Sequence, residues 1–244
     1  MENPDFTDKT VLVVGGSSGI GNGIARAFYD RKARVHVWGT RARAEDYAGE
    51  AGSDLAGLGY SGVDVGRPEE IAQAQAPFET LDVLVLCQGT VVYRRGEFER
   101  EAWDRVMAVN LDSLMHCSRR FYPELRASRG SIIIVSSISA LRANKGNPAY
   151  SASKAGAVNL TRTLGQAWAP DGIRVNGLAP GLVETKLTKV TTEHPQRRDA
   201  ALATIPVGRM GSPRDMAGVA LFLASPWAAY LCGETIVADG GATL

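Results

Sequence analysis

The sequence predicts an α/β fold in which a doubly wound, seven-stranded parallel sheet is covered by helices on both faces. Short apolar runs typical of buried strands recur along the chain, with segments of helical periodicity between them. A glycine-rich turn follows the first run and precedes an amphipathic segment. With 244 residues and 45% hydrophobic content, the chain can bury one large core, and we expect residues 1–244 to form a single domain.

The first half of the chain contains four expected strands. They are short runs rich in β-branched and apolar residues, and residues 21–32 between the first two have apolar residues at helical spacing. The third run is the weakest pattern and the fourth is the clearest. These strands are expected at residues 11–14, 35–38, 60–63 and 81–87.

The second half supplies three more strands and two long helices. We expect one helix over residues 101–126, where apolar side chains recur at helical steps and Asn110 is the polar exception. Another helix carries Tyr150 and ends before Pro170. The polar, proline-broken segment 182–209 is a candidate substrate lid. The remaining strands are expected at residues 131–136, 173–178 and 234–238.

Composition argues against several classes of protein. Lys and Arg total 27 against 26 Asp and Glu, and a net charge of +1 gives no basic excess for nucleic acid or an anionic membrane. The N-terminus lacks the basic and apolar regions of a secretion signal, and no run approaches the ~18 apolar residues of a membrane span. We therefore expect a soluble, cytoplasmic protein.

The cysteines and histidines are isolated from one another in the sequence. Cys87, Cys117 and Cys232 are an odd number without a C-x-x-C pair, which supports neither a disulfide framework nor a structural zinc site. The three histidines are equally dispersed, and packing explains them better than ligation does. We expect no metal ion.

The glycine-rich turn has the position and spacing of a dinucleotide-binding loop. Gly15 or Gly16, then Gly19 and Gly21, would let a diphosphate approach backbone N–H groups at the positive end of a helix, as in a Rossmann-type domain. A Walker-type phosphate loop is excluded, because no Gly-Lys-Ser/Thr follows the turn.

Two hydrolase motifs overlap these segments. Residues 15–19 match the G-x-S-x-G nucleophile elbow, and residues 151–154 match the S-x-x-K of acyl-transferring serine enzymes. A hydrolase is a poor interpretation, because an elbow on the first strand leaves no earlier loop to complete an oxyanion hole. The S-x-x-K motif also lacks its K-T-G and S-D-N partners.

Tyr150 and Lys154 are spaced to act together. Residues four apart share one face of a helix, so both side chains can point into one cleft. A tyrosine with a pKa near ~10 is a weak acid or base at neutral pH, and a neighbouring cation favours the phenolate. With Ser137 thirteen residues before Tyr150, and with the glycine turn, the pair predicts hydride-transfer chemistry.

These residues resemble the short-chain dehydrogenase/reductase family over nearly the whole chain. In that family Tyr150 would donate and accept the proton, and Ser137 would bind the carbonyl oxygen. Lys154 would hold the nicotinamide ribose and lower the pKa of the tyrosine, while Asn110 would anchor a water of the proton relay. Besides the glycine turn, the resemblance rests on Asp64-Val65, Val109-Asn110-Leu111, Ser137, Tyr150 with Lys154, Asn176, Pro180-Gly181 and Asp239-Gly240-Gly241.

The glycine turn and the resemblance together predict the cofactor-binding residues. By resemblance, Asp64 would bind the adenine amino group with Val65 beside it, while Val183 and Thr185 would hold the nicotinamide carboxamide. The expected set is Gly15, Gly16, Ser18, Gly19, Ile20, Gly21, Thr40, Arg41, Asp64, Val65, Gly89, Tyr150, Lys154, Pro180, Gly181, Val183 and Thr185.

Two stretches depart from the family pattern. Gly15 stands where the family has a threonine, and Cys87-Gln88-Gly89 replaces the usual Asn-Ala-Gly after the fourth strand. These changes affect the support of the cofactor rather than the expected proton transfer, so we still expect an active enzyme.

The end of the second strand bears on the choice of nicotinamide cofactor. A carboxylate there would bind the free ribose of NAD and repel the phosphate of NADP, but the chain has Gly39-Thr40-Arg41. The Thr40 hydroxyl and a guanidinium from Arg41 or Arg43 can accommodate a phosphate. Ser18, in contrast, stands where many NADP-using relatives carry a basic residue. We favour NADP(H), with NAD(H) as the alternative.

The expected substrate is a carbonyl compound or secondary alcohol that presents its oxygen to Ser137 and Tyr150. Residues 90–96, residues 138–148 and the candidate lid should set specificity, because loops at the carboxyl ends of strands form the crevice. Many similar chains reduce 3-oxoacyl thioesters on an acidic carrier protein, and small ketones, sugars and steroids are the alternatives. A basic patch for such a carrier would come from Arg119, Arg120, Arg126 and Arg129, with Asp171 opposing it.

The family resemblance also bears on assembly and on an alternative function. By this resemblance we expect a tetramer, because relatives are usually tetramers. The alternative function is a redox sensor without turnover, which would share the fold and the glycine turn. Such a sensor has no need of Ser137, Asn110, Tyr150 and Lys154 at these spacings, so we expect catalysis. Apolar residues on later helices agree with a homo-oligomer but are equally explained by core packing: Leu160, Leu164, Trp168, Leu221 and Phe222.

Overall fold

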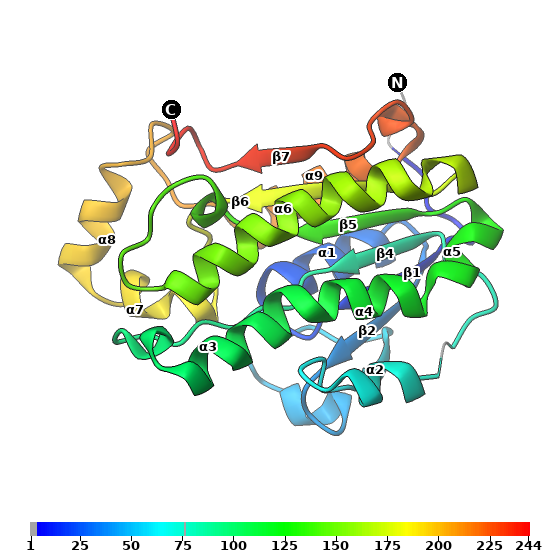
Figure 1. Cartoon of the computed structure of the whole chain (residues 1–244), viewed down its shortest axis with the longest axis horizontal. Coiled ribbons are helices and arrows are strands. Elements are labelled where there is room, and N and C mark those ends of the chain that lie inside the picture. The colour runs from blue at the N-terminus through cyan, green and yellow to red at the C-terminus, as the bar shows by residue number, and fades with distance from the viewer. Residues whose placement is uncertain (1–3, 76) are drawn as a thin grey trace.

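The sheet of the computed structural model has the strand order β3-β2-β1-β4-β5-β6-β7, with every neighbouring pair parallel (Figure 1). The structure describes residues 4–75 and 77–244. The predicted fold class is confirmed, and the expected strands differ from the observed ones only at their ends. The strands are β1 (Thr10–Val14), β2 (Arg34–Gly39), β3 (Gly59–Gly62), β4 (Val83–Leu86), β5 (Ser131–Val135), β6 (Arg174–Pro180) and β7 (Thr235–Ala238).

Alternate residues of the central strands face two separate cores. Leu12 and Val14 of β1 pack on one side of the sheet, and Val11 and Val13 pack on the other. Because both faces are buried, these strands are continuous apolar runs. The first core includes α2 (Pro68–Gln73), α4 (Ser113–Arg120), α5 (Tyr122–Ser128) and α6 (Pro148–Trp168), and the second includes α1 (Gly19–Tyr29) and α9 (Pro213–Ala224).

The two cores also account for the apolar residues considered for an oligomer interface. Leu164 and Leu221 are buried, and Leu160, Trp168 and Phe222 pack against the same clusters. These five side chains therefore serve core packing.

The helix expected over residues 101–126 is divided into several pieces. After α3 (Arg100–Met107), residues Ala108–Asp112 form a π-helical turn, and α4 and α5 follow. The turn contains Asn110, which is fully buried. A π turn inserts an extra residue into the helix, and such turns often mark functional sites. Apolar periodicity alone did not reveal this interruption.

The connection between β2 and β3 is a loop with one 3-10 turn, Ala44–Tyr47, rather than a long helix. The loop is fixed to α1, because Asn22 Nδ2 donates to the Asp54 carbonyl at 2.9 Å and Asp54 N donates to Asn22 Oδ1 at 3.0 Å. The N–H of Gly19 also donates to the carbonyl of Gly52 at 2.9 Å. The loop therefore lies beside the first turn of α1.

The candidate lid contains two short helices, α7 (Lys189–Thr192) and α8 (Pro195–Leu202), neither of which has a buried residue. Figure 1 shows them near the carboxyl ends of β6 and β7. The start of the segment is anchored by a parallel bridge between Val183 and Gly211. A few residues later the segment is linked to the loop after β4, because the Tyr93 hydroxyl donates to the Leu187 carbonyl.

Candidate active site

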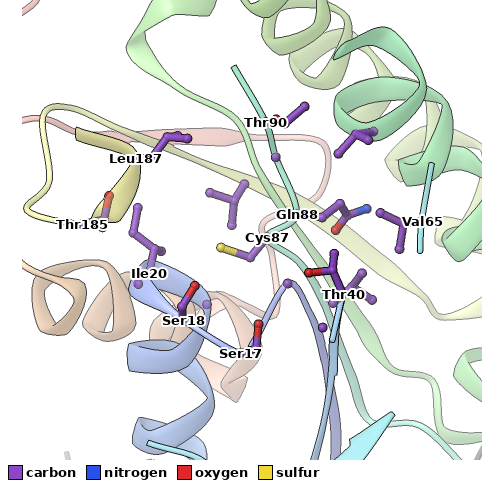
Figure 2. A pocket seen from close by; sticks show the side chains of 18 of the residues that line it. Ser17, Ser18, Ile20, Thr40, Val65, Cys87, Gln88, Thr90, Thr185 and Leu187 are labelled. Carbon is purple, nitrogen blue, oxygen red and sulfur yellow. The ribbon is translucent and has the colours of Figure 1, made fainter. Parts of the chain in front are cut away.

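A cavity of about 980 Å³ opens at the carboxyl ends of the strands. Thr40 and Val65 lie toward one end, and Thr185 and Leu187 lie toward the other (Figure 2). In doubly wound sheets the crevice beside the switch in strand order is the usual ligand site, and here the switch lies between β1 and β4. The cavity has the size and position expected for an extended ligand.

The glycine turn is shaped by close backbone contacts. Gly15 and Gly19 have φ values of 74° and 57°, which favour glycine. A Cβ on Gly15 would lie 2.8 Å from Cα of Gln88, and one on Gly21 would lie 2.2 Å from the carbonyl oxygen of Gly15. Glycine is therefore required for the turn to pass directly over the end of β4.

The first turn of α1 can receive an anionic group. Ser18 occupies the N-cap position, but its side chain makes no capping hydrogen bond. The first N–H groups of a helix have no partner within the helix, and they carry its positive partial charge. Residues 18–21 line the cavity, and since the N–H of Gly19 is engaged by the Gly52 carbonyl, the N–H groups of Ile20 and Gly21 are the donors that fit a dinucleotide diphosphate.

Tyr150, Lys154 and Ser137 line the cavity together. Tyr150 and Lys154 are one turn apart on α6, and the Lys154 ammonium lies 5.7 Å from the centroid of the Tyr150 ring. The same ammonium donates a 2.9 Å hydrogen bond to the carbonyl of Val135. Ser137 follows β5, and its hydroxyl accepts a hydrogen bond from Ser139 N at 3.1 Å. The predicted trio is thus assembled from one helix and one strand end.

Burial governs the titration of both α6 side chains. It raises the pKa of Tyr150 above 10.0, and a hydrogen bond with Ser137 acts in the opposite direction. Burial also lowers the pKa of Lys154 to about 8, with a small opposing contribution from Cys87. The pKa of Tyr150 is therefore raised overall, against the lowering that was expected, because desolvation of the phenolate dominates.

Asn110 lies behind the cavity and does not line it. Its Oδ1 accepts a hydrogen bond from Thr90 N at 2.7 Å, while Nδ2 donates to the Thr90 carbonyl at 2.9 Å and to Ser153 Oγ at 3.2 Å. The side chain thereby joins the loop after β4 to α6. It supports the site, and its amide is engaged by protein groups.

Two residues of the expected cofactor set do not line the cavity. A Cβ on Gly16 would lie 2.7 Å from the Val37 side chain, so this glycine permits packing against β2. Arg41 points its guanidinium at the Tyr47 ring, 4.2 Å from the centroid, and pairs with Glu50 at 2.8 Å. The remaining members of the set line the cavity. The expectation that Arg41 faces a phosphate is not met in this conformation.

Several lining residues were missed by the sequence analysis. Ser17, Arg67 and Lys186 lie within three residues of predicted positions, and that proximity was the available signal. Arg105 had no local signal. Lys186 also forms an ion pair with Glu50, which connects the β2–β3 loop to the candidate lid.

Gln88, one of the departures from the family pattern, is buried and lines the cavity. Its Nε2 donates to Ser113 Oγ at 2.8 Å, and that hydroxyl donates to the Val109 carbonyl at 2.7 Å. The larger side chain is thus accommodated by a hydrogen bond to α4.

Within residues 4–75 and 77–244, no three His, Cys, Asp or Glu side chains gather as a metal-binding cluster would require. In that part of the chain no helix is long and apolar enough to cross a bilayer.

Comparisons with known proteins give a consistent result. A family model described as enoyl-(acyl carrier protein) reductase matches residues 14–243. The chain is 35% identical to the 3-oxoacyl-acyl-carrier-protein reductase FabG of Chlamydia trachomatis, over 97% of this chain and 98% of that protein. It is 38% identical to a galactitol 2-dehydrogenase (L-tagatose-forming) of Cereibacter sphaeroides, over 95% of this chain and 94% of that protein.

The solved structures include a similar protein with a bound cofactor. RhlG of Pseudomonas aeruginosa, crystallised as an active-site complex with NADP, has a TM-score of 0.90 and 32% sequence identity. The match covers 100% of both chains. The described fold thus has an experimental counterpart in a protein that was solved with NADP.

Proposed function

The chain belongs to the short-chain dehydrogenase/reductase family, and we propose that it reduces a small carbonyl compound, or oxidises the corresponding secondary alcohol, with NADP(H). It is an NAD(P)-dependent oxidoreductase of that family. The observation that carries the proposal is the convergence of Tyr150, Lys154 and Ser137 on a cavity that also contains the open N-terminus of α1.

The lining residues fit a nicotinamide dinucleotide. The turn at residues 18–21 would hold the diphosphate, and Asp64 with Val65 would hold the adenine. Lys154 would hold the nicotinamide ribose, with Val183, Thr185, Gly89, Pro180 and Gly181 around the nicotinamide end. When bound, the nicotinamide ring supplies or accepts the hydride.

The proton steps belong to the chain itself. In the reductive direction Ser137 would donate a hydrogen bond to the carbonyl oxygen, and Tyr150 would transfer its phenolic proton to that oxygen. The raised pKa of Tyr150 keeps the phenol protonated at neutral pH, which suits reduction. The Ser137 hydrogen bond would then stabilise the resulting phenolate, while Asn110 supports the site through Thr90 and Ser153.

NADP(H) is favoured over NAD(H) by the absence of a carboxylate at the end of β2. Gly39 and Thr40 line that part of the cavity. RhlG, which has a similar structure, was crystallised with NADP. Arg41 would need to exchange its ion pair with Glu50 for the phosphate, and both groups are charged and partly exposed.

A small substrate is favoured by the charges on the face suggested for a carrier protein. Arg120 pairs with Glu124 at 3.1 Å, and Arg126 pairs with Asp171 at 3.2 Å. These ion pairs reduce the free basic charge that an acidic carrier would need. Reduction of a 3-oxoacyl thioester remains the second candidate, favoured by the 35% identity to FabG. A polyol or sugar is compatible with the similarity to galactitol 2-dehydrogenase.

Two structural roles belong to the same proposal. Residues 182–209 would serve as the substrate lid of a single-domain enzyme, since Tyr93 and Glu50 already connect this segment to the walls of the cavity.

Assembly into a homo-oligomer, expected to be a tetramer, would cover the exposed Trp227 and Tyr230 near β7. Light scattering of the purified protein measures the assembly directly.

The test combines binding with turnover. Fluorescence titration should give tighter binding of NADPH than of NADH, and a panel of ketones, sugars and acyl thioesters should contain a substrate. Replacing Tyr150 by phenylalanine should lower turnover by about 10²–10⁴-fold with cofactor affinity unchanged. If neither nucleotide binds, the cofactor assignment is wrong. If both bind and nothing in the panel turns over, the redox-sensor alternative is favoured.

A further inference from the structure

Glu97 is a fully buried carboxylate in the 3-10 turn Gly96–Phe98, between the loop after β4 and α3. A buried charge is unfavourable unless hydrogen bonds replace its hydration. Oε1 accepts hydrogen bonds from Val92 N at 3.0 Å and from Asn147 Nδ2 at 3.2 Å. Oε2 accepts one from Tyr150 N at 2.9 Å. Both carboxylate oxygens are therefore engaged.

The contact with Tyr150 N is a helix cap supplied from another element. Tyr150 is the third residue of α6, so its N–H belongs to the group that has no partner within the helix. Asn147 holds the N-cap position, but its side chain makes no capping bond. The carboxylate of Glu97 takes that role, and the helix dipole favours a negative charge there.

The other two contacts fix the substrate side of the cavity. Asn147 Nδ2 donates to the Val92 carbonyl at 3.1 Å as well as to Glu97. One carboxylate thus ties together residues 90–96, residues 138–148 and the start of α6. These are the two loops from which specificity is expected and the helix that carries Tyr150.

We propose that Glu97 is a positioning residue for the reaction proposed above: its carboxylate fixes the position of the Tyr150 backbone relative to Val92 in the loop of residues 90–96. The proposal rests on the proposed function of Tyr150. Glu97 does not line the main cavity and acts through its neighbours. Catalysis is sensitive to such placement, because a displacement of about 1 Å can lower a rate about 10²-fold.

The charge of Glu97 has a second effect on the phenol. It raises the pKa of Tyr150, in the same direction as burial, and so favours the protonated acid. Removing that charge should lower this pKa. The polar or titratable groups that face the phenol come from the segments after β4 and β5 and from α6: Ser137, Tyr93, Cys87, Glu97 and Lys154.

The test compares Glu97→Gln with Glu99→Gln, which makes the same change at an exposed position two residues away. In Glu97→Gln an amide cannot accept from all three donors, so amide hydrogen exchange in the first turn of α6 should be at least about tenfold faster. With the substrate found for the wild type, kcat should fall by about 10-fold to 100-fold, with little change in NADPH affinity. In the profile of kcat against pH, the limb that reports the ionisation of Tyr150 should move to lower pH. Glu99→Gln should match the wild type in all four measurements.

Glu97→Asp separates geometry from charge. The shorter side chain keeps the charge but cannot reach all its donors, so kcat should fall while the pH limb stays in place. Equal kcat and equal hydrogen exchange in Glu97→Gln and Glu99→Gln would overturn the proposal. The proposal would also be overturned if kcat fell in both Glu97 variants only in proportion to the loss of folded protein and of NADPH binding, and the Tyr150 limb of the pH–rate profile did not move. If the wild type turns over no substrate, the proposed function fails. Hydrogen exchange tests the Glu97 contact separately: an unchanged rate in the first turn of α6 in Glu97→Gln would overturn it.

Discussion

The ammonium of Lys154 lies 5.7 Å from the centroid of the Tyr150 ring, one turn away on the same helix. It donates its 2.9 Å hydrogen bond to the Val135 carbonyl at the end of β5. The cation is therefore held between the helix and the sheet, facing the ring. Burial is the main influence on the pKa of Tyr150. Lys154 lines the cavity, where we propose that it holds the nicotinamide ribose.

The first prediction concerns the pH dependence of cofactor binding. Burial lowers the pKa of Lys154 to about 8, so the folded protein carries the ammonium below that pH and loses it above. The dissociation constant of NADPH should rise as the pH passes through about 8, and fluorescence titration across that range measures it. In Lys154→Met this rise should disappear and binding should be weak at every pH; a rise that persists in the variant would contradict the assignment.

The same lysine affects stability with a defined sign. Its pKa is lower in the folded protein than the ordinary 10.5, so between about pH 8 and 10.5 the unfolded chain binds more protons. The contribution of Lys154 to the free energy of unfolding should therefore rise with pH in this window. Denaturant unfolding of the wild type and of Lys154→Met should show this difference in slope.

Ser137→Ala should lower turnover by about 10²–10³-fold, because it removes the hydroxyl that we propose donates a hydrogen bond to the reacting oxygen. NADPH affinity should be unchanged. The limb of the kcat–pH profile that reports Tyr150 should move to higher pH, because the hydrogen bond from Ser137 lowers the pKa of the phenol. Ser139→Ala is the matched control, since Ser139 contributes its backbone N–H to Ser137. Equal kinetics of the two variants would exclude Ser137 from the mechanism.

Thr40→Asp should reverse the cofactor preference. It adds a carboxylate to the cavity at the end of β2, where it would repel the phosphate of NADP and accept hydrogen bonds from the ribose of NAD. We expect NADPH affinity to fall by about tenfold or more, equivalent to ~1.4 kcal/mol. NADH affinity should hold or improve. Thr163→Asp, on an exposed part of α6, controls for net charge. A parallel loss of both affinities would argue against a phosphate site at Thr40.

Gly15→Ala should destabilise the protein and abolish NADPH binding. The residue has φ of 74°, and a Cβ would lie 2.8 Å from backbone atoms of Gln88. Thermal unfolding should show a loss of about 1–3 kcal/mol. Gly218→Ala on α9 is the control, because a Cβ there meets nothing within 4 Å. The higher helix propensity of alanine should raise its free energy of unfolding by about 0.5–1 kcal/mol. Similar unfolding of the two variants would show that the tight turn is not required.

Sequence pattern alone predicted the features that depend on neighbouring residues. The strands follow from apolar runs, because burial on both faces of a parallel sheet requires them. The placement of Tyr150 and Lys154 on one helical face follows from their spacing, and the turn at Gly15 follows from its position between β1 and α1. These predictions needed only local periodicity and backbone sterics.

Contacts between distant segments were decided by the tertiary structure. Glu97 and Tyr150 are 53 residues apart and meet only because the loop after β4 packs against the start of α6. Arg41 was expected to face a phosphate, but the β2–β3 loop brings Tyr47 and Glu50 to its guanidinium. Burial likewise reversed the expected direction of the pKa shift of Tyr150. Periodicity shows which face of a helix or strand is apolar, whereas hydrogen-bond partners and desolvation depend on groups that only folding brings together.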